Sequence, residues 1–134
     1  MTGFGLTVQR LGGDGCHVAV HGALDIAHAP RFDAAVRGAE RGGCDPIVID
    51  LSDIEFVDPT GLGRLISARR RSHRAGWRLV LVRGPAAVQR LFSAVALEDL
   101  FEFVPTAAEA VAQEPASTGP ASPVSRSPGW RSSP

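Results

Sequence analysis

Thr60 is the hydroxyl side chain best placed for chemistry in this sequence. It follows Asp58 and Pro59 and precedes Gly61, where an apolar strand pattern changes into a helical one. Asp58 suits the N-cap of a helix and Pro59 its first position, although Thr60 also fits the cap. In both arrangements the Thr60 hydroxyl lies at a helix N-terminus, where free amides and the helix dipole favour a phosphate group. From residue types alone, an ordinary helix start with a capping threonine is the stronger interpretation.

The lack of lysine narrows the enzymatic alternatives. All 14 basic residues are arginines, which excludes a Schiff-base lysine and the lysine of a P-loop. Asp50 ends an apolar strand pattern, but a receiver-type phosphoacceptor also needs a lysine and an acidic pair for Mg²⁺. Gly61 and Gly63 are not followed by the third glycine of a dinucleotide-binding fingerprint. We therefore expect a protein that is not an enzyme and holds no cofactor.

The charge balance bears on the class of partner. The 14 basic residues equal the 14 acidic ones, so the formal net charge is zero, whereas a dedicated nucleic-acid-binding protein carries a basic excess. Five arginines gather on and after one predicted helix: Arg69, Arg70, Arg71, Arg74 and Arg78. We interpret them as mostly a solvated helix face, although they also fit the edge of a protein interface. We expect no direct contact with nucleic acid.

The histidines do not have the spacing of a metal site. His17 and His21 alternate on one predicted strand, while His28 and His73 are scattered along the chain. Metal sites in proteins need convergent ligands at close and recognisable spacing. We expect no bound metal.

Cys16 and Cys44 are the two cysteines of the chain. They lack the C-x-x-C spacing and are too few for a disulfide scaffold, which suits a reducing cytosol. The N-terminus lacks the basic and apolar segments of a signal peptide, and no apolar run reaches the roughly 20 residues of a membrane-spanning helix. We therefore expect a cytoplasmic protein without a membrane contact.

Two hydrophobic periods alternate along the chain and predict the elements that position Thr60. Apolar runs predict strands over residues 6–11, 17–21, 47–49, 79–82 and 101–104, and apolar residues at helical spacing predict helices over residues 30–41, 59–75, 85–95 and 106–113. The order ββαβαβαβα predicts an α/β fold: a small mixed, mostly parallel sheet with about four helices and the N-terminal strand on an edge. We expect residues 54–57 to form a short apolar linker.

The composition changes near Glu114. Residues 114–134 contain five of the ten prolines and six serines, with few aliphatic residues. Such a segment buries too little apolar surface to offset the entropy of ordering. We expect one folded domain over residues 1–113 and a disordered tail over residues 114–134.

The segment around Thr60 contains Asp50-Leu51-Ser52, Phe56-Val57-Asp58 and Thr60-Gly61-Leu62-Gly63. In these residues it resembles the STAS domain of bacterial anti-sigma factor antagonists. Gly22-Ala23-Leu24-Asp25 with Ala29-Pro30 is similar to a second motif of the family, and residues 97–111 are similar to its closing strand and helix. The resemblance covers about residues 4–112. Pro59 stands where the family has serine or threonine.

The resemblance implies a switch in transcription regulation, active in stress responses. Thr60 is implied as the phosphoacceptor of a serine/threonine kinase that doubles as an anti-sigma factor, and a phosphatase reverses the step. The unphosphorylated protein is expected to capture the kinase and so release a sigma factor. The implied partner-binding residues are Asp25, Asp58, Pro59, Thr60, Gly61, Leu62, Gly63 and Arg64. A monomer or weak dimer is expected.

Physical reasons support such a switch at Thr60. Phosphorylation adds about −1.5 to −2 charges, two residues from Asp58 and near the loop in which we expect Asp25. Gly61 and Gly63 are expected to leave the backbone open to another chain. The alternative is a STAS scaffold or regulatory subunit of a lipid-transport or stress-sensing complex, because a fold does not fix a function.

Overall fold

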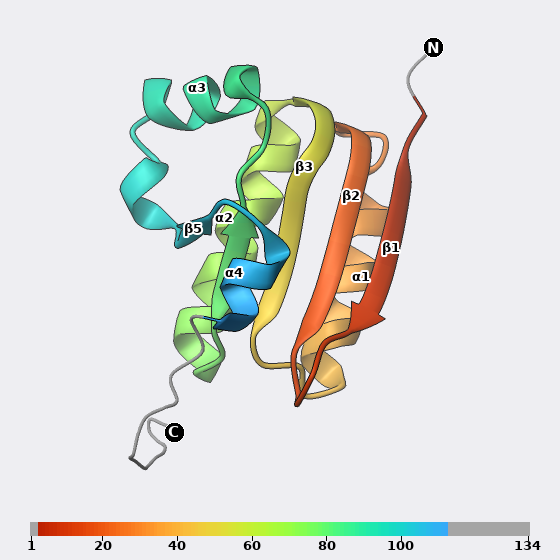
Figure 1. The fold of residues 1–134 in the computed structure, drawn as a ribbon. Coiled ribbons are helices and arrows are strands. Elements are labelled where there is room, and N and C mark those ends of the chain that lie inside the picture. The colour runs from red at the N-terminus through yellow and green to blue at the C-terminus, as the bar shows by residue number, and fades with distance from the viewer. Residues whose placement is uncertain (1–2, 113–134) are drawn as a thin grey trace.

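The computed structural model describes residues 3–112, which form a five-stranded sheet with helices on both faces (Figure 1). The strands lie in chain order across the sheet: β1 (Gly5–Arg10), β2 (Cys16–Leu24), β3 (Ile47–Val57), β4 (Leu79–Val82) and β5 (Phe103–Val104). β1 pairs antiparallel with β2, and the other three pairs are parallel. The prediction of a mixed, mostly parallel sheet with the N-terminal strand on an edge is confirmed.

Three α-helices and a short 3₁₀ helix lie between the strands and a fourth α-helix follows β5, so strands and α-helices occur in the predicted order. They are α1 (Ala29–Arg41), α2 (Pro59–Ala75), α3 (Ala86–Ala94), η1 (Glu98–Leu100) and α4 (Ala107–Ala112). α1 and α2 lie behind the sheet in Figure 1, and α4 lies in front of β3 and β4. The fold is therefore a layered α/β arrangement whose front face is covered only in part.

The core has two parts, one on each face of the sheet. The larger part includes Phe32, Leu51, Leu65 and Phe92, each with a fully buried side chain. The smaller part lies under α4 and consists of Val48, Val80, Val82, Val104 and Ala110. β4 is buried along its whole length because helices cover both of its faces, and a continuous apolar run is typical of such a strand.

β3 differs from the prediction because it continues through the expected linker to Val57. Residues 54–57 pair with the end of β2, where Ala23 faces Phe56 and Leu24 faces Val57. Register shifts between β2 and β3 interrupt the regular alternation of buried and exposed residues, so the pattern no longer looks like a strand. The β3 strand therefore leads directly into the turn that carries Thr60.

The cysteines also differ from the prediction. Cys16 and Cys44 form a disulfide that joins the start of β2 to the segment between α1 and β3, with the two Cα atoms 5.6 Å apart. The sequence analysis expected no disulfide scaffold from these two cysteines, but the α1 connection brings residues 28 positions apart into contact. The guanidinium of Arg10 lies 3.9 Å from Cys16 Sγ and 3.7 Å from Cys44 Sγ.

Candidate functional site

Thr60 lies in the first turn of α2, immediately after the carboxyl end of β3. Asp58 is the N-cap residue, with an extended backbone, and its Oδ1 accepts a hydrogen bond of 2.8 Å from the amide of Gly61. The two cap arrangements left open by the sequence are thereby resolved in favour of Asp58. Thr60 is the second residue of the helix and is half-buried. Its hydroxyl is therefore not needed for capping, and no hydrogen bond within residues 3–112 engages it.

Asp58 also holds the neighbouring loop. Its Oδ2 accepts a hydrogen bond of 3.1 Å from the amide of Ile26, and its own amide donates to the Leu24 carbonyl at 3.2 Å. The loop between β2 and α1 is thus tied to the Thr60 turn, and the expected proximity of Asp25 to that turn is confirmed at the level of the loop. In an α/β sheet, the carboxyl ends of the parallel strands are the usual place for a site.

Asp25 has a structural role of its own in this loop. Its Oδ1 accepts a hydrogen bond of 3.1 Å from the His28 amide and lies 2.8 Å from His28 Nδ1. The imidazole of His28 stacks on Phe4 with 4.3 Å between ring centroids. Asp25 and Asp58 therefore both fix backbone beside Thr60, and both stay partly accessible to a partner.

The two glycines of the predicted site have different surroundings. Gly61 is buried, and a Cβ there would lie 2.2 Å from the Leu24 carbonyl oxygen. The expectation that Gly61 leaves backbone open to another chain is wrong, because the end of β2 occupies that space. Gly63 has no atom within 4 Å of a Cβ position, so only this glycine leaves the helix surface open.

The remaining predicted residues form the outer surface of the α2 start. Pro59 and Arg64 are exposed, whereas Leu62 is partly buried against the core. Arg64 Nε lies 3.5 Å from Asp33 Oδ2 on α1. The structure therefore brings the predicted residues together at one end of the sheet, with Gly61 as the buried member.

Exposed apolar side chains flank this end of the sheet, and the sequence analysis missed them. Ile26 is 71% exposed and Phe56 is 55% exposed. Phe56 borders a groove of about 210 Å³ between the end of β3 and α3, lined also by Glu55, Val57, Ala87, Val88 and Leu91. A large apolar residue in a turn, such as Ile26, was the one signal in the sequence. Exposed apolar side chains next to a polar turn are typical of protein-binding surfaces.

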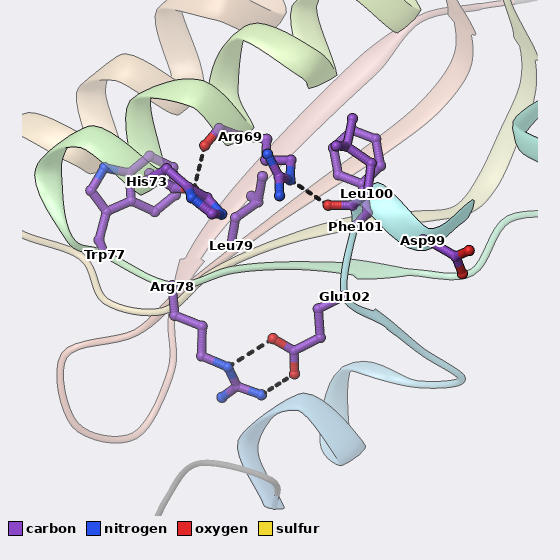
Figure 2. A pocket seen from close by; sticks show the side chains of 10 residues that line it. Arg69, His73, Trp77, Arg78, Leu79, Asp99, Leu100, Phe101 and Glu102 are labelled. Carbon is purple, nitrogen blue, oxygen red and sulfur yellow. Dashed lines mark hydrogen bonds and ion pairs between the residues drawn. The ribbon is translucent and has the colours of Figure 1, made fainter. Parts of the chain in front are cut away.

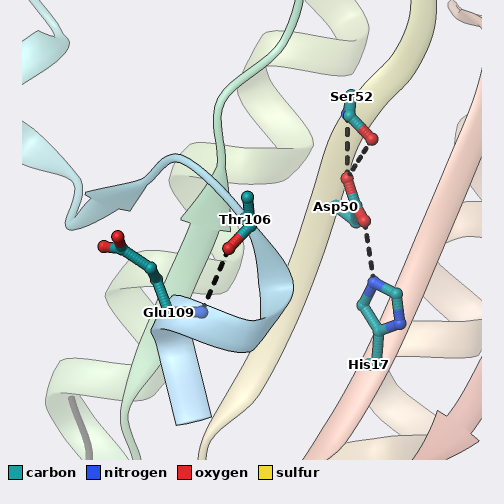
Figure 3. Close-up of polar contacts among 5 residues, drawn as sticks. All are labelled: His17, Asp50, Ser52, Thr106 and Glu109. Carbon is teal, nitrogen blue, oxygen red and sulfur yellow. Dashed lines mark hydrogen bonds and ion pairs between the residues drawn. The ribbon is translucent and has the colours of Figure 1, made fainter. Parts of the chain in front are cut away.

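A polar network lies on the front face of the sheet (Figure 3). Asp50 Oδ1 accepts hydrogen bonds from the Ser52 amide at 2.9 Å and the Ser52 hydroxyl at 2.7 Å, and Oδ2 lies 2.8 Å from His17 Nε2. Burial acts to raise the pKa of Asp50, but the hydrogen bonds from Ser52 and the His17 contact outweigh it and lower the pKa below its usual range. Ser52 donates to the carboxylate and not to the imidazole, so the trio lacks the nucleophile–base pair of a hydrolase.

The expectation that Asp50 bonds local amides is confirmed by Ser52, but Asp50 lies within β3 and not at its end. In the same view, Thr106 Oγ1 accepts a hydrogen bond of 3.2 Å from the Glu109 amide, which begins α4 over β3 (Figure 3). Both networks stabilise the front face. They lie apart from the Thr60 turn.

A cavity of about 390 Å³ lies beside the C-terminal half of α2, far along that helix from Thr60 (Figure 2). Its arginines are engaged within the chain. Arg78 Nε donates to Glu102 Oε1 at 3.1 Å, and Arg69 Nε donates to the Leu100 carbonyl. The Arg69 contact holds the segment before β5 against α2, and the Arg78 contact joins that segment to the residue before β4. We therefore assign these two arginines and Glu102 to folding.

The arginine-rich stretch is largely used by the fold. Arg71 binds Glu40 on α1, with 2.8 Å between Nη2 and Oε2, and Arg69 and Arg78 are engaged as above. Arg70 and Arg74 remain exposed. The expected solvated face is thus reduced to part of the cluster.

The described residues hold neither a metal-binding cluster nor a membrane-spanning helix. Residues 3–112 contain no group of three His, Cys, Asp or Glu side chains that could hold a metal ion. Within the same residues, no helix has both the length and the apolar character needed to cross a membrane. The predicted tail over residues 114–134 lies outside the described residues.

The chain is similar in sequence to a known family and to proteins of known role. A family model described as "Mlab, STAS domain" matches residues 7–105. The anti-sigma-B factor antagonist of Staphylococcus aureus (strain NCTC 8325 / PS 47) is 25% identical over 83 residues, which cover 62% of this chain and 77% of that protein.

Solved structures share the fold. An anti-sigma factor antagonist from Mycobacterium paratuberculosis has a TM-score of 0.74 at 24% identity, over 82% of this chain and 92% of that one. The Bacillus cell fate determinant SpoIIAA in its phosphorylated form has a TM-score of 0.65 at 17% identity, over 81% of this chain and 98% of that one. These TM-scores show that both proteins share the fold of residues 3–112.

Proposed function

The chain belongs to the STAS domain family, as the sequence motifs predicted, and on that premise we propose that it is an anti-sigma factor antagonist switched by phosphorylation of Thr60. The observation that carries the proposal is the Thr60 turn. Asp58 supplies the cap, so the Thr60 hydroxyl has no structural hydrogen bond to lose within the described chain. The names of the relatives support the same function.

In the proposed cycle, the partner is an anti-sigma factor that is also a serine/threonine kinase. The Thr60 oxygen attacks the γ-phosphorus of ATP held by the kinase, the bond from that phosphorus to the bridging oxygen breaks, and ADP leaves. The hydroxyl proton passes to a base of the kinase. A phosphatase then hydrolyses the phosphothreonine with water and returns threonine and inorganic phosphate.

The phosphate changes binding through charge and space. It adds about −1.5 to −2 charges to a turn that already holds the carboxylate of Asp58 and is tied to the loop that carries Asp25. A partner that packs closely on the start of α2 loses contact area and meets added repulsion. A loss of about 2–3 kcal/mol weakens binding by roughly 30- to 150-fold, which is enough for a switch.

The exposed apolar side chains supply the binding energy in this proposal. Ile26 and Phe56 flank the Thr60 turn from the β2–α1 loop and from β3. Buried apolar anchors within a polar surround carry most of the energy of protein interfaces. The protein then acts by binding and not as an enzyme, in the cytoplasm where sigma factors work.

The test is a binding measurement with the purified ATP-binding anti-sigma kinase, using wild type, Thr60→Ala and Thr60→Asp. Thr60→Ala should bind at least as tightly as wild type and should stay unmodified with ATP. Thr60→Asp should bind at least tenfold more weakly, and mass spectrometry of the wild type after incubation should place one phosphate on Thr60. Equal binding of the two variants, or a phosphate elsewhere, would overturn the proposal.

Pro59 favours one alternative function, in which the domain is a permanent subunit of a lipid-transport or stress-sensing complex. Its exposed ring stands immediately before Thr60, at the position where the kinase must approach. In this case the protein, recovered from cells, should carry no phosphate on Thr60. It should also copurify with membrane transporter subunits in place of a kinase.

A further inference from the structure

Arg64 is the cationic side chain one helical turn after Thr60. Residues four apart on a helix lie on the same face, and long side chains lean towards the helix N-terminus. The Arg64 guanidinium is therefore within reach of a group carried by Thr60. In the described structure it turns to α1, where Nε lies 3.5 Å from Asp33 Oδ2.

The Arg64–Asp33 contact is weak enough to be exchanged. Arg64 is 44% exposed, and the 3.5 Å separation is long for a charged hydrogen bond, whose usual length is about 2.7–2.9 Å. An exposed ion pair of this kind contributes little. A phosphate dianion offers three oxygens and a higher charge, and guanidinium groups bind it through two parallel hydrogen bonds.

The charge of the Asp33 carboxylate is neutralised only while Arg64 lies beside it. Its side chain is 22% exposed, and its Oδ1 is buried without a hydrogen-bond partner in the part of the chain that the structure describes. If Arg64 moves away, the Asp33 carboxylate loses its cation and its negative charge is uncovered on α1. A phosphate added on α2 thus also makes the surface of the neighbouring helix α1 more negative, because Arg64 no longer neutralises Asp33.

We propose that Arg64 is a phosphate latch, which leaves Asp33 and binds the phosphate when Thr60 is phosphorylated. This inference rests on the phosphorylation of Thr60 in the proposed function. The latch clamps the phosphate against the start of α2 and uncovers Asp33, so the acidic surface extends from the turn onto α1. Arg31, a further cation on α1, is engaged elsewhere: its guanidinium lies 5.0 Å from the Phe4 ring centre.

The test uses protein with phosphothreonine incorporated at position 60 during synthesis, so that it needs no kinase. Phosphorus NMR follows the second ionisation of the phosphate, which has its midpoint at about pH 6 when no cation is near. Arg64→Gln should raise the midpoint by a few tenths of a pH unit relative to the wild type, the size expected of a partly exposed ion pair. Asp33→Asn, which removes the competitor for Arg64, should lower the midpoint below the wild-type value.

Arg70→Gln is the matched control, since Arg70 is an exposed arginine of the same helix beyond reach of Thr60. It should leave the midpoint at the wild-type value. Equal midpoints for the wild type and Arg64→Gln would overturn the latch. Failure of the kinase to bind or modify Thr60 would overturn the proposed function alone, because the NMR experiment contains no kinase.

Discussion

Gly61 faces Leu24 so closely that a Cβ at position 61 would lie 2.2 Å from the Leu24 carbonyl oxygen and 2.9 Å from its Cγ. The start of α2 therefore rests directly on the end of β2. This contact fixes the depth of the Thr60 turn relative to the loop that carries Asp25 and Ile26. The glycine of the predicted motif serves packing within the chain, while the surface that a partner meets is formed by its neighbours.

The first prediction compares the two glycines of this turn. Gly61→Ala should lower the free energy of unfolding by about 1–3 kcal/mol, because the added methyl meets backbone that cannot move away. Gly63→Ala, in open space on the same helix, should raise it by up to about 1 kcal/mol through helix propensity. Urea unfolding followed by circular dichroism measures both. Effects of the same sign would contradict the packing assignment.

The second prediction concerns the exposed apolar residues. Ile26→Ser and Phe56→Ser should each weaken binding of the anti-sigma kinase by about 30-fold or more, the effect of losing an interface anchor. Both side chains are mostly exposed in the free protein, so the unfolding free energy should change by less than about 0.5 kcal/mol. Isothermal titration calorimetry measures the affinity.

Val8→Ser is the control for these anchors, because Val8 is 51% exposed on β1, at the edge of the sheet. It should leave the affinity unchanged. If Val8→Ser weakens binding as much as Phe56→Ser does, the kinase does not recognise the end of the sheet around Thr60.

The sequence predicts the elements best where burial is uniform. The strand predicted over residues 79–82 is β4, with the same bounds. Helices cover both faces of this strand, so all four of its residues are apolar and no polar residue interrupts the run. The end of β3 was missed because the register shifts against β2 place Phe56 outward and Val57 inward. Pairing partners decide such a segment, and they are distant in the sequence.

In the site, too, the sequence predicts local features but not the contacts between distant residues. The motif identified Thr60 and Asp58, because a cap, a proline and a glycine act over neighbouring residues. The contact of Asp58 with Ile26 and the pairing of Cys16 with Cys44 join residues about 30 positions apart. They depend on how β2 and α1 return to the sheet, which residue spacing alone does not specify.

The third prediction is a pH dependence of stability that arises at Asp50. The pKa of this carboxyl group is lowered in the folded protein, since the hydrogen bonds from Ser52 and the His17 contact outweigh the opposing effect of burial. A carboxyl group with a lowered pKa stabilises the fold above its unfolded pKa, near pH 4. That contribution is lost as the pH falls through the lower folded value.

Ser52→Ala should therefore lower the unfolding free energy by about 1 kcal/mol at pH 7, and the difference should shrink at pH 3. Urea unfolding at the two pH values measures it. In an Asp50→Asn background the difference should no longer depend on pH. A Ser52→Ala effect of the same size at pH 7 and pH 3 in the wild-type background would show that the hydrogen bonds do not favour the ionised form.

The last prediction concerns the Cys16–Cys44 bond, which closes a loop containing all of α1. By the chain-entropy argument, a cross-link over 28 positions stabilises a fold by about 3–4 kcal/mol, because it restricts the unfolded chain. Treatment with dithiothreitol should therefore lower the unfolding free energy by an amount of that order. A Cys16→Ser/Cys44→Ser variant should have the lower stability from the start and should not respond to the reductant. Two titratable thiols in the untreated, denatured protein would contradict the bond itself, whereas a reductant effect equal in both proteins would show that the stability change arises elsewhere.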